Sequence, residues 1–364
     1  MAIHSREYKN WSADVHQKFS DKPIVMQMEI TYQCPIHCLH CYSDCYNNKE
    51  YAKNELSTEE IKLIMDKIYA AGCMWFTFTG GDPMIRKDFI ELYDYAKDKG
   101  FIVSVMTSLT ALTDDILCKL SKKPPFSIEM TLNGVTRETY EKISQVKGSF
   151  DRAINGINSV IKAGLPIKVK TLISKNNQHE VEDISDYLEK LGLKFSPSTS
   201  IFARLNGDNE PCKYRLPVDD VLKYDFSEDD CELASSVDVD DKTRAYDGMD
   251  RVSGSFYRCA VGSWQWHINP IGRLNICSCV RDVDYDILNG NVLDGVKYLR
   301  DYVKNKKFSS AGRCGDCKLW HICGSCPGKA KLELGDECGA VDYFCELAKK
   351  KNVILNHYKS VIKE

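Results

Sequence analysis

The sequence lacks the features of secreted, membrane-spanning and nucleic-acid-binding proteins. Residues 1–5 do not lead into an apolar signal segment, and no run approaches the roughly 18 apolar residues of a membrane span. The formal net charge of −3 provides no basic field that would attract nucleic acid. Internal repeats and low-complexity tracts are also absent. We therefore expect a soluble, cytoplasmic protein that binds neither membranes nor nucleic acid.

Cysteine, by contrast, is abundant. The chain of 364 residues has 17 cysteines, of which four lie between Cys34 and Cys45 and nine between Cys259 and Cys345. In a chain without a secretion signal, thiols stay reduced, and clustered cysteines are more often metal ligands than disulfides. The other four are scattered and are interpreted as apolar fillers or inert surface thiols: Cys73, Cys118, Cys212 and Cys231.

Short apolar runs alternate with amphipathic segments over residues 24–200. Strands are predicted at residues 24–31, 74–79, 101–107, 126–132, 167–173 and 193–198, and helices at 57–72, 88–100, 150–163 and 181–191. Ser57 and Glu60 form a capping box for the first helix, whose apolar stripe is Ile61, Ile64, Met65, Ile68 and Tyr69. Six β-then-α units in a row predict an α/β fold with a parallel sheet. They are too few for a closed eight-unit barrel, and an open sheet and a partial barrel remain alternatives.

The periodicity breaks after Pro211, which divides the chain into segments. Residues 1–23 are an N-terminal extension and 24–210 the α/β domain, followed by an acidic bridging segment at 211–256. A cysteine-rich module covers 257–348, and a helix at 349–364 closes the chain. The acidic segment is either a solvated linker or partly ordered against substrate.

The first cysteine cluster directly follows the first predicted strand. Cys34, Cys38 and Cys41 have the spacing C-x3-C-x2-C, which lets one short loop present three thiolates to an iron–sulfur cluster. A [4Fe–4S] cluster normally takes four thiolates, so three leave one iron open for a reactive ligand. Cys45 is the alternative fourth ligand, and a zinc or purely structural site is the alternative function.

Together with the turn Gly80-Gly81-Asp82-Pro83 after the second strand, this triad resembles the radical S-adenosylmethionine (radical SAM) enzymes. The turn is similar to the family's Gly-Gly-Glu-Pro motif, which contacts the methionine amino group, with Asp82 in place of Glu. The resemblance implies a partial (β/α)6 TIM-type barrel, with Ser108, Thr131 and Asn133 facing the cofactor at strand ends. It also implies that the reduced cluster cleaves S-adenosylmethionine to a 5′-deoxyadenosyl radical, which abstracts a substrate hydrogen.

The C-terminal cysteines closely resemble the SPASM domain, an auxiliary-cluster module of radical SAM enzymes. Cys259 and Cys277 form a C-x17-C pair that contains a Gly-x4-Cys string, and a C-x2-C-x5-C-x2-C run follows later. The resemblance implies two auxiliary clusters, hence three [4Fe–4S] clusters in all. One auxiliary cluster would be held by Cys314, Cys317, Cys323 and Cys345, and the other by Cys259, Cys277 and Cys326. The fourth ligand of the latter is Cys279, Cys338 or a substrate group, and zinc is the alternative metal.

SPASM enzymes act mostly on peptides or proteins, which implies that the substrate here is a ribosomally made precursor peptide. The expected modification is a crosslink, a thioether or a backbone change. A sulfatase maturase is the alternative enzyme, although Ser278 stands where those enzymes carry an Asp. The non-enzymatic alternative is an iron–sulfur or zinc scaffold. Expected partners are a separate leader-peptide-recognition protein and a low-potential electron donor such as flavodoxin or ferredoxin. Arg204 either holds a peptide carbonyl or carboxylate or forms a surface salt bridge.

Overall fold

The computed structural model describes residues 22–224, 256–257, 259, 262–308, 313–320 and 322–362. All of its strands belong to one sheet, ordered β6-β5-β4-β3-β2-β1-β7-β8-β9. In chain order they are β1 (Val25–Glu29), β2 (Trp75–Thr79), β3 (Ile102–Met106), β4 (Ser127–Thr131), β5 (Ile167–Leu172), β6 (Ser196–Ser198), β7 (Gln265–Ile268), β8 (Arg273–Cys277) and β9 (Val280–Asp286). The strands β1 to β6 pair in parallel, which confirms all six predicted strands and the α/β fold class.

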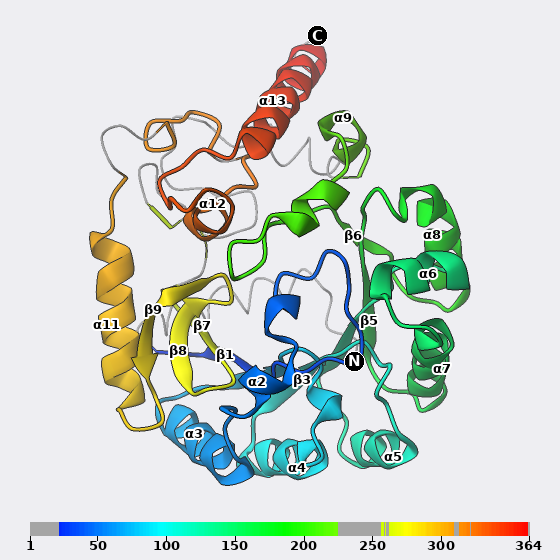
Figure 1. Ribbon diagram of the computed structural model, residues 1–364, viewed down its shortest axis with the longest axis vertical. Coiled ribbons are helices and arrows are strands. Elements are labelled where there is room, and N and C mark those ends of the chain that lie inside the picture. Colours follow the sequence, from blue (N-terminus) through cyan, green and yellow to red (C-terminus); the bar gives the residue numbers. More distant parts are fainter. Residues whose placement is uncertain are drawn as a thin grey trace.

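The helices of the α/β domain lie along the outer side of the curved sheet (Figure 1). They are α3 (Thr58–Ala70), α4 (Phe89–Lys99), α5 (Asp114–Lys122), α6 (Arg137–Ser144), α7 (Ser149–Lys162) and α8 (Val181–Lys190). The short helix α2 (Lys49–Ala52) lies inside this ring of helices. Short 3-10 turns are η1 (Asp44–Tyr46), η2 (Pro83–Ile85), η3 (Gln178–Glu180) and η4 (Glu210–Tyr214). The helices α5 and α6 have no counterpart in the sequence prediction. Because the sheet stays open beyond β6, the architecture is the partial barrel.

Local sequence signals set the ends of these helices. The Ser57 side chain accepts a hydrogen bond from the Glu60 N–H, and the Glu60 carboxylate accepts one from the Ser57 N–H, so the predicted capping box is confirmed. The helix α4 ends before Gly100, whose φ of 95° suits glycine. The predicted stripe of α3 is buried except at Tyr69, which is 49% exposed. The prediction for Tyr69 is therefore wrong, and its ring contacts Phe101 edge-on at the end of the helix.

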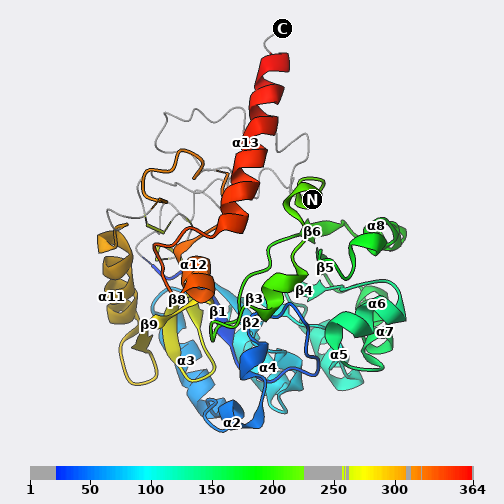
Figure 2. The same ribbon diagram turned by 45° about the horizontal axis from the view of Figure 1, so that its top comes forward.

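The cysteine-rich part continues the sheet of the barrel. The strand β7 pairs in parallel with β1, from Val25 beside Gln265 to Met28 beside Ile268, and β8 and β9 follow as antiparallel neighbours. The helices of this part are α11 (Val292–Asn305), α12 (Pro327–Leu334) and α13 (Asp342–Ile362). The helix α13 begins seven residues before the predicted boundary at 349 and projects from the body of the molecule (Figure 2). One hydrophobic core contains side chains from both parts, among them Met26 and Trp266.

Part of the predicted bridging segment packs between the barrel and α13. The helix α9 (Val218–Val221) follows η4, and its Val221 lies in a small buried cluster with Ile173 of the barrel and Leu347 of α13. A solvated linker is therefore the wrong interpretation for residues 211–224. The acidic runs at 227–230 and 238–241 and the extension at 1–21 lie outside the described residues. Among the described helices, none is both long and apolar enough to cross a membrane.

Candidate active site

Cys34, Cys38 and Cys41 line one cavity of about 400 Å³ at the end of β1. Their loop is held from two sides. The side chain of Asn47 accepts a hydrogen bond from the Cys34 N–H (3.0 Å) and donates one to the Cys34 carbonyl (3.1 Å). The N–H groups of His37 and Leu39 donate to carbonyls in the last turn of α6. The loop is therefore fixed before any ligand binds. Cys45, the alternative fourth ligand, does not line this cavity, and its Sγ lies 3.9 Å from the Tyr42 carbonyl oxygen.

The three thiols are suited to metal coordination. Burial raises the pKa of each above its ordinary value, and the carboxylate of Asp82 adds to this effect at Cys34. At Cys38 the Asn133 side chain, whose Nδ2 donates to Sγ at 3.4 Å, opposes the shift. Buried thiolates that are unfavourable alone become favourable when a cation binds them. Among the described residues, no three His, Cys, Asp or Glu side chains meet around a single metal ion. A cluster presents its irons at separate corners, so its ligands need not converge in that way.

The two glycines after β2 are needed because the cysteine loop passes directly against them. The Gly81 N–H donates to the Thr31 carbonyl (2.9 Å), and the Asp82 N–H donates to the Gln33 carbonyl (2.8 Å). A Cβ atom at Gly80 would lie 2.3 Å from the Thr31 carbonyl oxygen, and one at Gly81 would lie 2.2 Å from that of Gln33. The Gly-Gly turn therefore positions the residues that lead into Cys34, in addition to any contact with a ligand.

The Asp82 carboxylate is directed into the protein and does not line the cavity, nor do Gly80 and Pro83. It accepts hydrogen bonds from the Thr107 hydroxyl (2.9 Å), from the Ser108 hydroxyl (2.6 Å) and N–H (2.8 Å), and from the Met84 N–H (3.1 Å). Burial raises the pKa of Asp82, and these hydrogen bonds oppose the shift. The side chain thus ties the end of β2 to the end of β3. Gly81 is the residue of the turn that lines the cavity.

The other predicted cofactor residues, Ser108, Thr131 and Asn133, all line the cavity. Asn133 is 2% exposed, and its Oδ1 has no hydrogen-bond partner. Thr171 on β5, which the sequence analysis did not single out, also lines the cavity with a fully buried Oγ1 that has no partner. Such atoms are costly unless a ligand or water satisfies them, so they indicate the positions of polar ligand groups. The position of Thr171 near the end of a predicted strand was the signal that could have identified it.

Charged side chains reach the cavity at one place. Glu129 of β4 and Lys170 of β5 both line it and form an ion pair of 2.5 Å. Arg204 does not line it. Its guanidinium pairs with Asp208 at 2.6 Å, which is the surface salt bridge rather than the predicted peptide contact.

Comparison with known families explains this arrangement. Residues 28–188 match the family described as the radical SAM superfamily, and the match runs from the end of β1 through the cysteine loop into α8. This part of the chain is a radical SAM domain. The cysteine triad, the Gly-Gly turn and the polar strand ends all lie within it.

Relatives with this domain have several named activities. The chain is 32% identical over 187 residues to Fe-coproporphyrin III synthase of Methanosarcina barkeri, covering 51% of this chain but only 46% of that protein. It is 22% identical over 348 residues to AdoMet-dependent heme synthase of the same organism, covering 87% and 95%. To mycofactocin maturase MftC of Mycobacterium tuberculosis (strain CDC 1551 / Oshkosh) it is 26% identical over 324 residues, covering 84% and 78%.

Two solved structures share the fold of the whole chain. Streptococcus suis SuiB bound to its precursor peptide SuiA matches with a TM-score of 0.68 at 14% identity, covering 95% of this chain and 82% of SuiB. The protein anSMEcpe with bound AdoMet and a peptide matches with a TM-score of 0.65 at 16% identity, covering 93% and 99%. The likeness therefore extends beyond the radical SAM domain into the cysteine-rich part.

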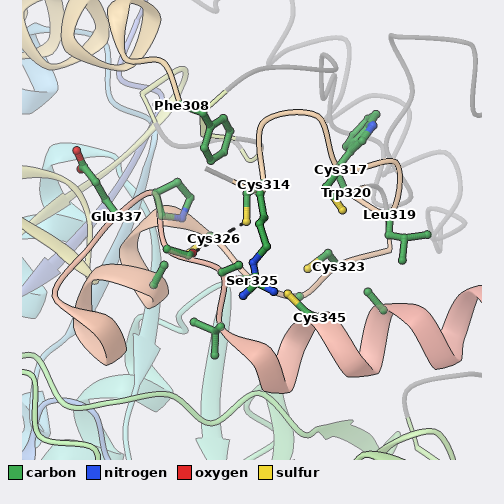
Figure 3. Close-up of a pocket in the computed structure, with 18 of the residues that line it drawn as sticks. Phe308, Cys314, Cys317, Leu319, Trp320, Cys323, Ser325, Cys326, Glu337 and Cys345 are labelled. Carbon is green, nitrogen blue, oxygen red and sulfur yellow. Dashed lines mark hydrogen bonds between the residues drawn. The ribbon is translucent and has the colours of Figure 1, made fainter. Parts of the chain in front are cut away.

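A second cavity, of about 380 Å³, lies in the cysteine-rich part (Figure 3). Cys314, Cys317, Cys323 and Cys345 line it, and Figure 3 shows the sulfur atoms of the last three pointing toward the same space. Cys259 and Cys326 line it as well. Cys277 lies instead at the end of β8, where its thiol contacts Cys279. Six of the seven predicted C-terminal ligands therefore line the second cavity, and Cys277 does not.

A buried ionic network connects this part to the radical SAM domain. The Arg281 guanidinium of β9 donates to the Glu29 carboxylate of β1 at 2.6 Å, and His267 Nε2 of β7 lies 3.2 Å from the same oxygen. Burial tends to raise the pKa of Glu29, but Arg281 and His267 outweigh it and lower that pKa to about 2. Arg281 also donates to the Ser278 carbonyl at 2.8 Å. The network therefore fixes the β8–β9 turn relative to the strand that leads into the cysteine loop.

Proposed function

We propose that this chain is a radical SAM enzyme that modifies a precursor peptide. The observation that carries the proposal is the composition of the first cavity. Three half-buried thiols line it together with two unpartnered polar atoms, on Asn133 and Thr171, at the ends of neighbouring strands. A cavity that combines cluster ligands with unsatisfied polar groups is suited to hold a small polar cofactor beside the metal.

Each residue has a defined task in this proposal. Cys34, Cys38 and Cys41 hold a [4Fe–4S] cluster with one iron free of protein ligands. Ser108, Thr131, Asn133 and the backbone of Gly81 bind S-adenosylmethionine, with Thr171 as a further polar contact. When bound, the cluster and S-adenosylmethionine supply a 5′-deoxyadenosyl radical that abstracts a substrate hydrogen. The protein orients the substrate and keeps water from the cavity, for which the apolar side chains of Ile36, Met106 and Leu172 in its wall are suited.

The peptide substrate rests on similarity to the mycofactocin maturase over most of the chain. In this proposal the cysteine-rich part holds two auxiliary clusters, and a low-potential flavodoxin or ferredoxin supplies electrons. A separate small protein delivers the leader of the precursor. The chain works in the cytoplasm, where thiols remain reduced.

A tetrapyrrole is the second candidate substrate. Sequence similarity to Fe-coproporphyrin III synthase and to AdoMet-dependent heme synthase favours it. A porphyrin carries carboxylates, and Lys170 of the Glu129–Lys170 pair is a cation in the cavity wall that could receive one.

The test is S-adenosylmethionine cleavage by the anaerobically reconstituted, reduced protein. We expect 5′-deoxyadenosine and methionine from the wild type, and a loss of at least a hundredfold in Cys38→Ala. Cys118→Ala is the matched control, because Cys118 is exposed on α5, remote from the cavity. Absence of cleavage in the wild type would contradict the proposal.

The products that the enzyme forms then identify its substrate. Candidate precursor peptides encoded beside the gene and Fe-coproporphyrin III are incubated separately with the reduced enzyme, and products are analysed by mass spectrometry. A mass change in a peptide supports peptide modification. Loss of carboxyl groups from the porphyrin, with no change in any peptide, would assign the second candidate instead.

A further inference from the structure

The cysteines of the C-terminal part form two groups. Cys314, Cys317, Cys323 and Cys345 surround the second cavity, and Cys323 interacts electrostatically with the other three. The second group consists of Cys277, Cys279 and Cys326, which also interact with one another. Cys279, a member of this group, is not one of the seven cysteines that the SPASM resemblance assigns as cluster ligands.

The β8–β9 turn brings Cys277 and Cys279 together. Cys277 is the last residue of β8, pairs with Val280 of β9 across an irregular register, and leaves only Ser278 and Cys279 in the turn. The side chains of the two cysteines interact with each other. The turn is also held rigidly, because Arg281 donates to the Ser278 carbonyl and is itself paired with Glu29. Both thiols are therefore held in place by the fold.

The start of α12 adds Cys326 to this pair. Cys326 is the N-cap of α12, and its Sγ accepts a hydrogen bond from the Lys329 N–H at 3.5 Å. A Cβ atom at Gly328 would lie 3.3 Å from the Cys279 Cβ and 2.9 Å from a methyl of Val280. The helix thus packs directly against the turn, and a larger residue at 328 would push Cys326 away from Cys279. An N-cap position with a backbone donor suits a thiolate ligand.

Cys338 is the other candidate for the fourth ligand. Its side chain packs against the main hydrophobic core, as that of Cys277 does, and its N–H donates to the Asp336 carboxylate at 2.9 Å. Cys338 is not among the principal electrostatic neighbours of Cys277, Cys279 or Cys326, whereas those three are neighbours of one another.

We propose that Cys279 is the extra protein ligand of the auxiliary cluster that Cys277 and Cys326 hold. This inference rests on the proposed function. With Cys259 as the remaining ligand, the cluster is ligated entirely by protein and offers no open iron to a substrate thiolate. Substrate would then meet an open iron only at the first cavity, and the auxiliary centre would serve electron transfer or folding.

The test uses the full chain with Cys34, Cys38 and Cys41 all changed to Ala, which removes the first cluster and its open iron. Two auxiliary clusters correspond to about 8 irons per chain after anaerobic reconstitution. Into this background we introduce Cys279→Ala, Cys277→Ala as the positive control, and Cys338→Ala as the matched control. Iron content and the electron paramagnetic resonance spectrum are recorded with and without β-mercaptoethanol, and circular dichroism checks folding.

We expect the background and Cys338→Ala to keep about 8 irons and to show no spectral response to the added thiol. Cys279→Ala should either fall to about 4 irons or keep its clusters and respond to the thiol through the vacated iron. The inference is wrong if Cys279→Ala behaves like the background, if Cys338→Ala shows the loss, or if the background itself responds to thiol or holds no auxiliary cluster. Cleavage of S-adenosylmethionine by the wild type tests the proposed function independently, because it requires the first cavity.

Discussion

At the residue scale, the close contact at Gly80 and Gly81 controls the position of the candidate cluster. Each glycine faces a carbonyl oxygen of the segment leading into Cys34, at a distance that no Cβ atom can occupy. The usual interpretation of such a turn is an approach to a ligand. Here the nearest approach is by the protein's own backbone. A change at either glycine would therefore act on the cysteine loop even in the absence of cofactor.

Gly80→Ala and Gly100→Ala form a matched pair that separates this contact from backbone strain. Both glycines have positive φ, 140° and 95°, but a Cβ at Gly100 meets nothing within 4 Å. We expect Gly100→Ala to lower the free energy of unfolding by about 1 kcal/mol, from strain alone. Gly80→Ala should lower it by about 2–4 kcal/mol and should also reduce the iron bound at the first site. Urea unfolding and iron content measure these effects, and equal behaviour of the two variants would contradict the prediction.

At the element scale, the ionic network of Glu29, His267 and Arg281 joins three strands, β1, β7 and β9. The side chains of Glu29 and Arg281 are only 4% and 13% exposed. A buried pair of this kind is weak evidence for net stabilisation, because desolvation offsets the attraction. Removal of one partner is strongly destabilising, because it leaves the other charge buried without an opposite charge. The network is thus better understood as a device that fixes how the C-terminal hairpin sits on the barrel.

Glu29→Gln should change both the free energy of unfolding and its dependence on pH. At pH 7 we expect a loss of about 3–5 kcal/mol, because Arg281 remains charged and buried. The folded pKa of Glu29 is lowered from 4.5 to about 2, so its ionised form stabilises the fold above pH 4.5 and this contribution disappears as the pH falls toward 2. Between pH 5 and pH 3 the wild type should lose about 2 kcal/mol more than the variant.

The measurement is urea unfolding followed by tryptophan fluorescence at several pH values, with both proteins treated identically so that any loss of iron in acid is shared. Parallel pH profiles for wild type and variant would show that Glu29 does not carry this dependence.

At the scale of the whole molecule, the barrel and the cysteine-rich part share one sheet and one core. The strand β7 covers the edge of β1 that would otherwise be exposed, and Trp266 and Met26 belong to the same hydrophobic core. An exposed parallel edge of this kind promotes aggregation. The radical SAM domain defined by residues 28–188 is therefore not expected to be stable as an isolated fragment.

We predict a single cooperative thermal transition for the described body of the protein, in which the barrel and the β7–β9 sheet unfold together. Differential scanning calorimetry of the reconstituted chain measures it. Two separate transitions, or a fragment of residues 22–224 that stays folded and monomeric, would show that the two parts are independent.

The sequence by itself determined the six parallel strands and the cysteine loop. Short apolar runs that alternate with amphipathic segments located the six parallel strands, because a strand covered by helices is apolar along its length. The spacing of Cys34, Cys38 and Cys41 identified the cluster loop, because all three ligands lie within eight consecutive residues. Such features are local, and a single sequence is sufficient to read them.

Only the tertiary structure decided which distant groups meet. The pairing of β7 with β1, the inward direction of Asp82 and the unpartnered Thr171 all depend on contacts between residues far apart in the chain. The same is true of the cysteines, since the packing of α12 on the β8–β9 turn brings Cys326 to Cys277 and Cys279. Backbone hydrogen bonds and side-chain volume select these contacts from many that the residue types alone would allow.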